Sequence, residues 1–256
     1  MLKMRVIPTL LWKDPGLVKG VRFNSWRRIG SILPAIKVYN TRQVDELIVL
    51  DITATKEHRT PDYEMIREIS SECYCPLTVG GGVGNISHVK NLLKAGADKI
   101  CINTAAYENP TLISDVAHVF GAQCVVVSID AKKMGNGTYK CFSHSGTHNT
   151  GVNVDVWAKR VEALGAGEIL ITSIEHDGVL QGYDLDLIKL VTKNVNIPVI
   201  AGGGAGSYED FYEAIHIGKA AAVAAASMFH FTEQTPVEAK QFLALKGIPV
   251  RSAYRT

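Results

Sequence analysis

The sequence predicts an α/β protein folded as a (β/α)8 barrel, a closed ring of eight parallel strands with helices packed outside it. Three observations predict this fold. The length of 256 residues matches a single barrel domain spanning residues 1–256. Short β-rich apolar runs alternate with amphipathic helical stretches. The two halves of the chain also resemble each other.

Eight apolar runs have the length and the β-branched composition of buried strands. A parallel pair of strands needs a crossover connection, so strands that alternate with helices indicate a parallel sheet. The strands are expected near Arg5–Leu10, Glu46–Ile52, Pro76–Gly80, Lys99–Asn103, Gln123–Ile129, Glu168–Ser173, Pro198–Ala201 and Ala221–Ala226.

Amphipathic stretches fill the gaps between these strands, as a barrel requires. An open doubly wound sheet would also satisfy this alternation. The expected helices include Asp62–Ser71, Asn85–Lys94, Asp155–Leu164, Leu185–Lys193, Tyr208–Ile217 and Pro236–Leu245.

An internal repeat favours the closed barrel over the open sheet. The triplet Gly80–Gly82 returns at Gly202–Gly204, an offset of 202 − 80 = 122, and the same offset carries Glu46 onto Glu168. Self-similarity of this kind predicts two half-barrels that join into one ring.

Two connections are longer than ordinary strand-to-helix loops. The first runs from Leu11 to about Ser31, and the fifth runs from Asp130 to about Val152. Both follow a strand, on the face where barrel enzymes place their chemistry. We expect both to cover a substrate, with a small hairpin at Asn136-Gly137 in the second.

The glycine triplets predict two anion sites, because backbone N–H groups can approach a phosphate where no Cβ intervenes. Tightening of the strand-to-helix turn is the alternative interpretation of each triplet. A hydroxyl or amide beside a helix start completes each site, so a ligand with two phosphates could span the barrel mouth. The predicted anion-binding residues are Gly81, Gly82, Gly203, Gly204, Asn103, Thr104, Ala226 and Ser227.

Asp130 ends the fifth strand, which places a carboxylate at the centre of the same mouth. This is a usual position for a general acid or base, although an N-cap or loop anchor would also explain it. Further polar groups are expected there at strand ends or in the first loop: Lys19, Asp51, Thr172 and Asp177.

Charged residues start four of the predicted strands, at the opposite end of the barrel. Two are positive and two are negative, so they can form a ring across the barrel floor. A salt-bridged plug that stabilises the bottom is the simplest interpretation. The four residues are Arg5, Glu46, Lys99 and Glu168.

Composition argues against several classes of protein. A net charge of +2 without a basic arm does not favour nucleic-acid binding. No apolar run approaches the roughly 20 residues of a membrane span, and the N-terminus does not have the pattern of a signal peptide. Five cysteines without a CxxC pair predict reduced, mostly buried thiols and no metal site. We therefore expect a cytoplasmic protein.

Motifs along nearly the whole chain resemble the HisF family, the cyclase subunits of imidazole glycerol phosphate synthase. They are LDITAT (Leu50–Thr55), TVGGGV (Thr78–Val83), AGADKICINTAA (Ala95–Ala106), FGAQCVVVSIDAKK (Phe120–Lys133), LGAGEILITSI (Leu164–Ile174), GYDLDLI (Gly182–Ile188), IPVIAGGGAG (Ile197–Gly206) and FHF (Phe229–Phe231).

The resemblance implies a lyase-type TIM barrel that needs no cofactor and pairs with a HisH-like glutaminase docked beneath the floor. In this family the charged ring would act as a gate, and ammonia would pass it and travel through the barrel. Asp98 would lie at the interface with the glutaminase. The ammonia would attack a phosphorylated ribulosyl-formimino precursor, and two aspartates would serve as acid and base. Asp130 matches the second aspartate, and Ser145 and Gly178 are implied among the ligand-binding residues.

The first catalytic aspartate of the family is missing. The family's first strand reads like CLDVKDGRVVKG, whereas this chain has TLLWKDPGLVKG, which puts Leu11 at the aspartate position. Asp14 lies three residues further on, beyond the strand end. The family's RDGT also becomes His176-Asp177-Gly178-Val179, which loses a hydroxyl.

LLWKDPGLVKGVRF and VYNTRQVDEL resemble a HisF-like subgroup associated with surface-polysaccharide loci. That subgroup is thought to supply ammonia, with a HisH-like glutaminase and a sugar amidating enzyme, for amidation of a sugar. The hypothesis preferred from the sequence is therefore ammonia delivery for sugar amidation. A working cyclase of histidine biosynthesis and a bare binding or scaffold barrel remain the alternatives.

Overall fold

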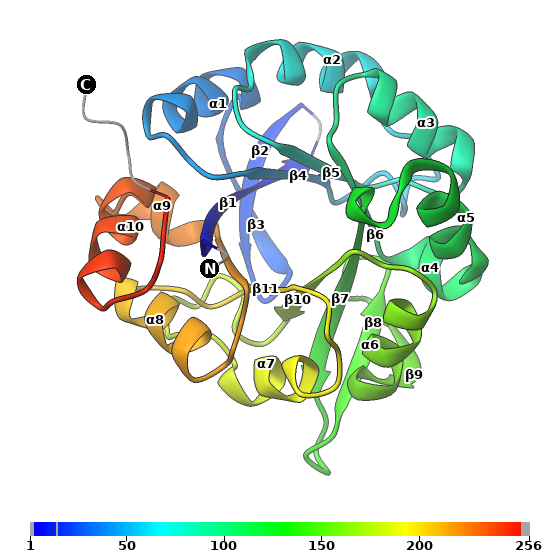
Figure 1. Cartoon of the computed structure of the whole chain (residues 1–256). Coiled ribbons are helices and arrows are strands. Elements are labelled where there is room, and N and C mark those ends of the chain that lie inside the picture. Colours follow the sequence, from blue (N-terminus) through cyan, green and yellow to red (C-terminus); the bar gives the residue numbers. More distant parts are fainter. Residues whose placement is uncertain (1–2, 14, 252–256) are drawn as a thin grey trace.

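Eight parallel strands close into a barrel in the computed structural model, which describes residues 3–13 and 15–251 (Figure 1). The strands follow one another in chain order around the ring, and β10 pairs with β7 to close it. The barrel strands are β1 (Arg5–Lys13), β4 (Leu47–Asp51), β5 (Leu77–Gly80), β6 (Lys99–Ile102), β7 (Val125–Lys133), β10 (Glu168–Ser173), β11 (Val199–Gly202) and β12 (Ala222–Ala225).

Helices surround the barrel and cover the outer face of its sheet (Figure 1). Several begin at side-chain caps, since Asp62, Asn85, Asp184 and Ser207 each accept a bond from a backbone N–H in the first turn. The helices are α1 (Ile32–Thr41), α2 (Tyr63–Glu72), α3 (Ile86–Lys94), α4 (Thr104–Glu108), α5 (Thr111–Phe120), α6 (Val154–Ala163), α7 (Leu185–Thr192), α8 (Tyr208–His216), α9 (Ser227–Phe231) and α10 (Pro236–Leu245).

The caps repeat with the period of the sequence. Asp62 accepts from the Met65 N–H and Asp184 from the Leu187 N–H, both at 3.0 Å. The offset between the two caps is 184 − 62 = 122, the same as between the glycine triplets. Equivalent helices therefore start in the same way in the two halves of the barrel.

Two apolar layers stabilise the fold. A large outer core fills the space between the strands and the helices. A smaller inner cluster fills the barrel itself, as expected for a closed barrel of this size. Its members are Ile7, Ile48, Cys101, Val126, Leu170, Ile200, Ala222 and Ala224.

Both long connections contain β-structure. The fifth connection forms the expected hairpin, with a turn at Asn136-Gly137 between β7 and β8 (Tyr139–Ser143), and continues as β9 (His148–Asn153). The first connection was predicted only as a long loop, but it folds into an antiparallel hairpin of β2 (Gly16–Val21) and β3 (Asn24–Gly30). Its turn uses positive φ angles at Arg22 and Phe23, residues that do not signal a hairpin in a sequence.

Smaller differences have local causes. The predicted strand from Gln123 begins at Val125, because residues Ala122–Cys124 form a short 3-10 turn. The expectation of mostly buried cysteines was wrong for three of the five, since Cys73, Cys75 and Cys124 are only partly buried. Across the described ranges, none of the helices is long and apolar enough to cross a membrane.

Candidate functional site

A pocket of about 390 Å³ opens at the carboxyl ends of the barrel strands. Its volume lies in the range of small-molecule binding sites. The structure brings the catalytic candidate Asp130, the position of the missing aspartate (Leu11) and all the residues predicted for ligand binding into its lining. The ligand-binding candidates are Lys19, Asp51, Gly81, Gly82, Asn103, Thr104, Ser145, Thr172, Asp177, Gly178, Gly203, Gly204, Ala226 and Ser227.

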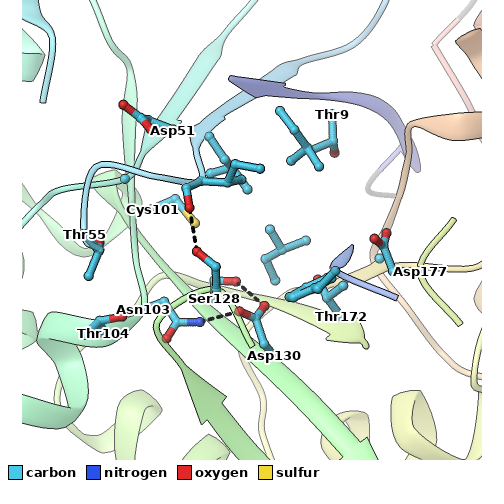
Figure 2. Close-up of a pocket in the computed structure, with 18 of the residues that line it drawn as sticks. Thr9, Asp51, Thr55, Cys101, Asn103, Thr104, Ser128, Asp130, Thr172 and Asp177 are labelled. Carbon is cyan, nitrogen blue, oxygen red and sulfur yellow. Dashed lines mark hydrogen bonds between the residues drawn. The ribbon is translucent and has the colours of Figure 1, made fainter. Parts of the chain in front are cut away.

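Asp130 lies at the centre of a small hydrogen-bond network in this pocket (Figure 2). Asn103 Nδ2 donates to Asp130 Oδ2 at 2.8 Å, and Ser128 Oγ donates to Asp130 Oδ1 at 3.4 Å. Burial raises the pKa of Asp130 to about 7, and the charge of Asp177 acts in the same direction, while the two hydrogen bonds oppose the rise. Asp130 can therefore both hold and release a proton near neutral pH.

Asp177 is a second carboxylate with an altered pKa in the same pocket (Figure 2). Burial raises the pKa of Asp177 to about 6, although the positive charge of Lys19 and a hydrogen bond from the Phe23 backbone favour the ionised form. Lys19 is itself 3% exposed, and burial lowers the pKa of its ammonium to about 8. Its Nζ donates to the Thr9 carbonyl at 3.0 Å.

Leu11 faces this pocket from the first strand. It pairs with Leu50 of β4 on one side and with Val18 of β2 on the other, and it is half-buried. Thr9, two residues earlier, also lines the pocket, as the alternation of a strand requires. An aliphatic side chain therefore occupies a position that points at the ligand space. Asp14 lies outside the described residues.

Asp51 has a different environment from the other two aspartates. Arg59 Nη1 donates to Asp51 Oδ2 at 3.1 Å, and the backbone N–H groups of Thr53 and Ala54 both donate to Oδ1 at 2.9 Å. These partners hold the carboxylate in place and fix the loop that follows β4. Asp51 is better suited to shape the pocket than to transfer a proton.

The glycines of the two triplets are required by packing alone. At Gly81, φ is +103° and a Cβ would lie 2.2 Å from the Asp51 carbonyl oxygen. At Gly204, φ is +120° and a Cβ would lie 2.2 Å from the Gly182 carbonyl oxygen. Each turn therefore needs a glycine for its packing, and phosphate binding at the two triplets stays a prediction.

Among the remaining predicted polar residues, Thr104 and Ser145 form hydrogen bonds with other loops of the barrel mouth. Thr104 Oγ1 accepts from the His144 N–H at 3.0 Å, and Ser145 Oγ donates to the Ile52 carbonyl at 2.7 Å. These two bonds fasten the fifth connection over the mouth. Thr172 sits opposite Asp130 in the pairing of β10 with β7, and Ser227 starts α9.

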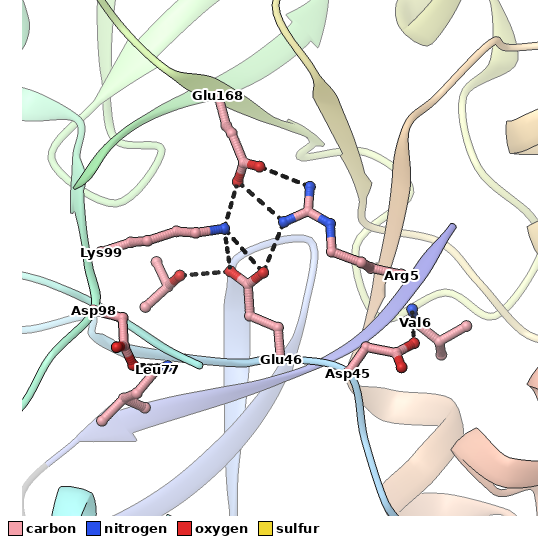
Figure 3. Close-up of polar contacts among 9 residues, drawn as sticks. Arg5, Val6, Asp45, Glu46, Leu77, Asp98, Lys99 and Glu168 are labelled. Atoms are coloured by element: carbon pink, nitrogen blue, oxygen red, sulfur yellow. Dashed lines mark hydrogen bonds and ion pairs between the residues drawn. The ribbon is translucent and has the colours of Figure 1, made fainter. Parts of the chain in front are cut away.

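At the opposite end of the barrel, the four charged residues form a closed ring (Figure 3). Arg5 contacts Glu46 at 2.7 Å and Glu168 at 2.8 Å, while Lys99 Nζ lies 3.0 Å from each glutamate. Thr78 Oγ1 also donates to Glu46 Oε1 at 2.7 Å. Each charge thus has two opposite charges as neighbours, and the ring spans the barrel floor as predicted.

Asp98 is exposed on the same floor, next to the ring. Its Oδ2 accepts from the Leu77 N–H at 2.8 Å, which ties the start of β5 to the turn before β6 (Figure 3). The side chain therefore has a structural role of its own. Its predicted contact with a partner stays a prediction.

Several lining residues were missed by sequence reasoning. Arg59, His58 and His88 add positive or titratable groups near Gly82, and Glu108 adds a carboxylate from α4. The loop that carries His58 and Arg59 lacks a strand or helix pattern, so only an unusual density of polar groups after β4 could have drawn attention to it.

Comparisons with a family model and with individual known proteins point to the same family. The histidine biosynthesis protein family matches residues 5–235. The imidazole glycerol phosphate synthase subunit HisF of Natranaerobius thermophilus is 47% identical over 251 residues, 98% of this chain and 100% of that protein. The subunit of the same name from Caulobacter vibrioides is 49% identical over 252 residues, 98% of this chain and 97% of that protein.

The chain belongs to the HisF family. Membership covers nearly the full length, so the barrel, the pocket at its mouth and the ring on its floor all lie within the part shared with HisF proteins. The matches give no support for the narrower assignment to a sugar-amidation subgroup within the HisF family. That assignment rests on Leu11 and on the sequence around it.

Proposed function

We propose that this chain is the cyclase subunit of an imidazole glycerol phosphate synthase. The relatives at 47% and 49% identity carry that name, which supports the cyclase reading over the sugar-amidation reading. The proposed substrate is the phosphorylated ribulosyl-formimino precursor, and the products are imidazole glycerol phosphate and an aminoimidazole carboxamide ribonucleotide. The proposed partner is a HisH-like glutaminase that supplies ammonia.

One observation carries this proposal: two aspartates with pKa values of about 7 and about 6 share one pocket. At neutral pH Asp130 is protonated in about half of the molecules and Asp177 is mostly ionised, so Asp130 can donate a proton while Asp177 accepts one. Ring formation from ammonia needs both steps, since the attacking nitrogen loses protons and the departing oxygens gain them. The first strand has Leu11 where the family resemblance places an aspartate. Asp177 thus offers the second carboxyl group that this strand lacks.

The interior of the barrel supports ammonia passage from the floor. Above the ring lies the inner apolar cluster, and three of its members, Cys101, Leu170 and Ala224, also line the pocket. An apolar path favours neutral ammonia over the ammonium ion, because a buried charge without a partner is costly. The ring is closed in this structure, so passage requires one of its ion pairs to open.

The test is the ammonia-dependent cyclase reaction, with ammonium salt in place of the glutaminase. The wild type should turn over the precursor. Asp130→Asn and Asp177→Asn should each lower kcat by about 10²–10⁴-fold, because each removes one member of the acid/base pair. Asp115→Asn, at an exposed position on α5, is the matched control. Unchanged activity in Asp177→Asn would show that Asp177 transfers no proton.

Leu11 favours a second candidate function, in which the chain only conducts ammonia to a separate sugar-amidating enzyme. A leucine cannot exchange a proton, and its position in the pocket lining is where the family resemblance places an aspartate. This candidate predicts that the wild type lacks cyclase activity but still activates a glutaminase. The variant Leu11→Asp separates the two functions, because cyclase activity that is absent in the wild type and present in the variant would favour ammonia delivery.

A further inference from the structure

Two cysteines approach each other on the barrel floor, in the segment between α2 and β5. Cys73 Sγ and Cys75 Sγ lie 3.7 Å apart, and the Cys73 thiol also donates to the Cys75 carbonyl oxygen at 3.3 Å. The backbone of Cys73 is extended, with φ −98° and ψ 120°, so residues 73 and 75 project to the same side. Tyr74, between them, is 83% exposed.

The surroundings of this segment keep the two thiols together. The Tyr74 N–H donates to Asn40 Oδ1 at 3.2 Å, and the Pro76 carbonyl accepts from the Leu47 N–H at 2.9 Å. The backbone is thus fixed on α1 and β4 on either side of Cys75. A disulfide bond has a sulfur–sulfur distance of about 2.05 Å, so closure requires the two sulfurs to move closer than their present 3.7 Å.

The two sulfurs are chemically unequal. The hydrogen bond between the two sulfurs lowers the pKa of the Cys73 thiol below its usual value, although burial and the charge of Asp98 oppose this. The pKa of the Cys75 thiol is raised, first by its hydrogen bond to Cys73 and then by burial and by the nearby negative charges of Glu46 and Asp45. An attacking thiolate beside a second thiol that can resolve the adduct is the arrangement of redox-active cysteines.

We propose that Cys73 and Cys75 form a reversible redox site, which exchanges with small disulfides of the glutathione class and closes to an intramolecular disulfide. Neither the cyclase reading nor the ammonia-delivery reading uses these thiols, since the pocket lies at the other end of the barrel. Cys101 and Cys141 are buried, and the thiol of Cys124 donates to the carbonyl of Phe120, the last residue of α5.

The exchange proceeds in two balanced steps. The Cys73 thiolate attacks one sulfur of the small disulfide, which forms a mixed disulfide and releases one thiolate. The Cys75 sulfur, having lost its proton to solvent, then attacks the Cys73 sulfur and releases the second small thiol. The protein loses two hydrogen atoms and two electrons, and the small disulfide is reduced to two thiols.

The site adjoins the charged ring. Cys75 leads through Pro76 into β5, whose Thr78 holds Glu46, and the Leu77 N–H is bound by Asp98. Disulfide formation would therefore fix the chain that enters the floor of the barrel and the exposed Tyr74 beside it. If the proposed glutaminase docks on this floor, its binding surface includes the redox site; this point alone rests on the proposed function.

The test is titration of the whole chain with oxidised glutathione near pH 7, followed by alkylation and mass spectrometry. The five thiols of the reduced chain should fall to 5 − 2 = 3. Trypsin releases both cysteines in one peptide, residues 68–90, which contains no other cysteine. That peptide should lose two hydrogen atoms and recover them with dithiothreitol. An unchanged peptide would overturn the proposal.

Single variants identify the attacking sulfur. Cys75→Ser should stop at the mixed disulfide and gain one glutathionyl group on Cys73. Cys73→Ser should gain this group at least about fivefold more slowly, since burial and the charges of Glu46 and Asp45 still raise the pKa of Cys75 in this variant and leave it little thiolate near pH 7. Cys124→Ser, the matched control, should close as the wild type does. Equal adduct rates in Cys73→Ser and Cys75→Ser, or a wild type that stops at the mixed disulfide, would refute the mechanism.

Discussion

At the scale of single residues, Asp130 is a buried carboxyl group whose ionisation should lower the stability of the fold. The side chain is almost completely buried, and the two hydrogen bonds that it accepts do not offset the loss of water around its charge. Its pKa of about 7 compares with about 3.9 in an unfolded chain. The native state therefore binds a proton that the unfolded state has already released between these pH values.

Because the pKa of Asp130 is higher in the native state than in the unfolded state, the free energy of unfolding should fall as the pH rises. Stability falls wherever the native state holds more protons than the unfolded state. The contribution of Asp130 should therefore fall between about pH 4 and pH 7. Asp130→Asn should raise the free energy of unfolding at pH 8 by about 1–3 kcal/mol, with little effect at pH 4.

Urea denaturation at a series of pH values checks this prediction. The exposed Asp115 on α5 provides the control, because Asp115→Asn changes the same chemical group without burial. The prediction fails when the difference between Asp130→Asn and the wild type is the same at pH 4 and pH 8.

At the scale of elements, the hairpin of β2 and β3 closes one side of the pocket. The Arg22 N–H donates to the Asp177 carbonyl at 2.8 Å, so the hairpin tip is bonded to the turn after β10. The contact is close, because a Cβ on Gly178 would lie 2.2 Å from the Gly20 carbonyl oxygen. The position of the hairpin therefore depends on a glycine in another part of the chain.

Gly178→Ala should displace this hairpin while the barrel stays folded. Limited trypsin digestion should cleave residues 16–30 several-fold faster in the variant, because a segment that loses its contacts opens more often. Gly151→Ala is a matched control, since Gly151 has a similar φ of +76° but nothing within 4 Å of its Cβ position. Both variants should lose about 1 kcal/mol from backbone strain. Equal digestion rates in the two variants would contradict the prediction.

At the scale of the whole molecule, a buried ion pair joins the two ends of the chain. Lys240 on α10 is 3% exposed, and its Nζ lies 3.3 Å from Asp45 Oδ1. The other oxygen of Asp45 accepts from the Val6 N–H at 3.0 Å. The last helix is thereby connected to the residues that precede β4 and to β1, the first barrel strand, which pairs with the last, β12.

Lys240→Met should lower the free energy of unfolding by about 3 kcal/mol, because it leaves the Asp45 charge buried without its partner. Lys246→Met is the control, since Lys246 pairs with Glu209 but its side chain is 39% exposed. Loss of an exposed pair should cost less than about 1 kcal/mol. Thermal and urea denaturation measure both values, and a similar cost for the two variants would contradict the role assigned to Lys240.

Most of the fold was predictable, because its signals are local and repeated. The observed bounds of β10 and α10 are those expected from the sequence, and the turn at Asn136-Gly137 forms the expected hairpin. The first hairpin was not predictable in the same way. Its turn places Arg22 and Phe23 at positive φ, where neither residue type is favoured, so tertiary contacts must hold it.

The sequence by itself determined the strand order, the ring residues on the floor and the presence of Leu11 where a carboxylate was expected. Periodicity places the ring residues at strand starts, and the resemblance of the first strand to the family's motif marks the position of Leu11. Only the tertiary structure decided which aspartates share a pocket, why two of them bind protons near neutral pH, and how closely Cys73 and Cys75 approach. Those properties depend on burial and on charges brought together from distant segments. Neither can be predicted from the residues of one short segment.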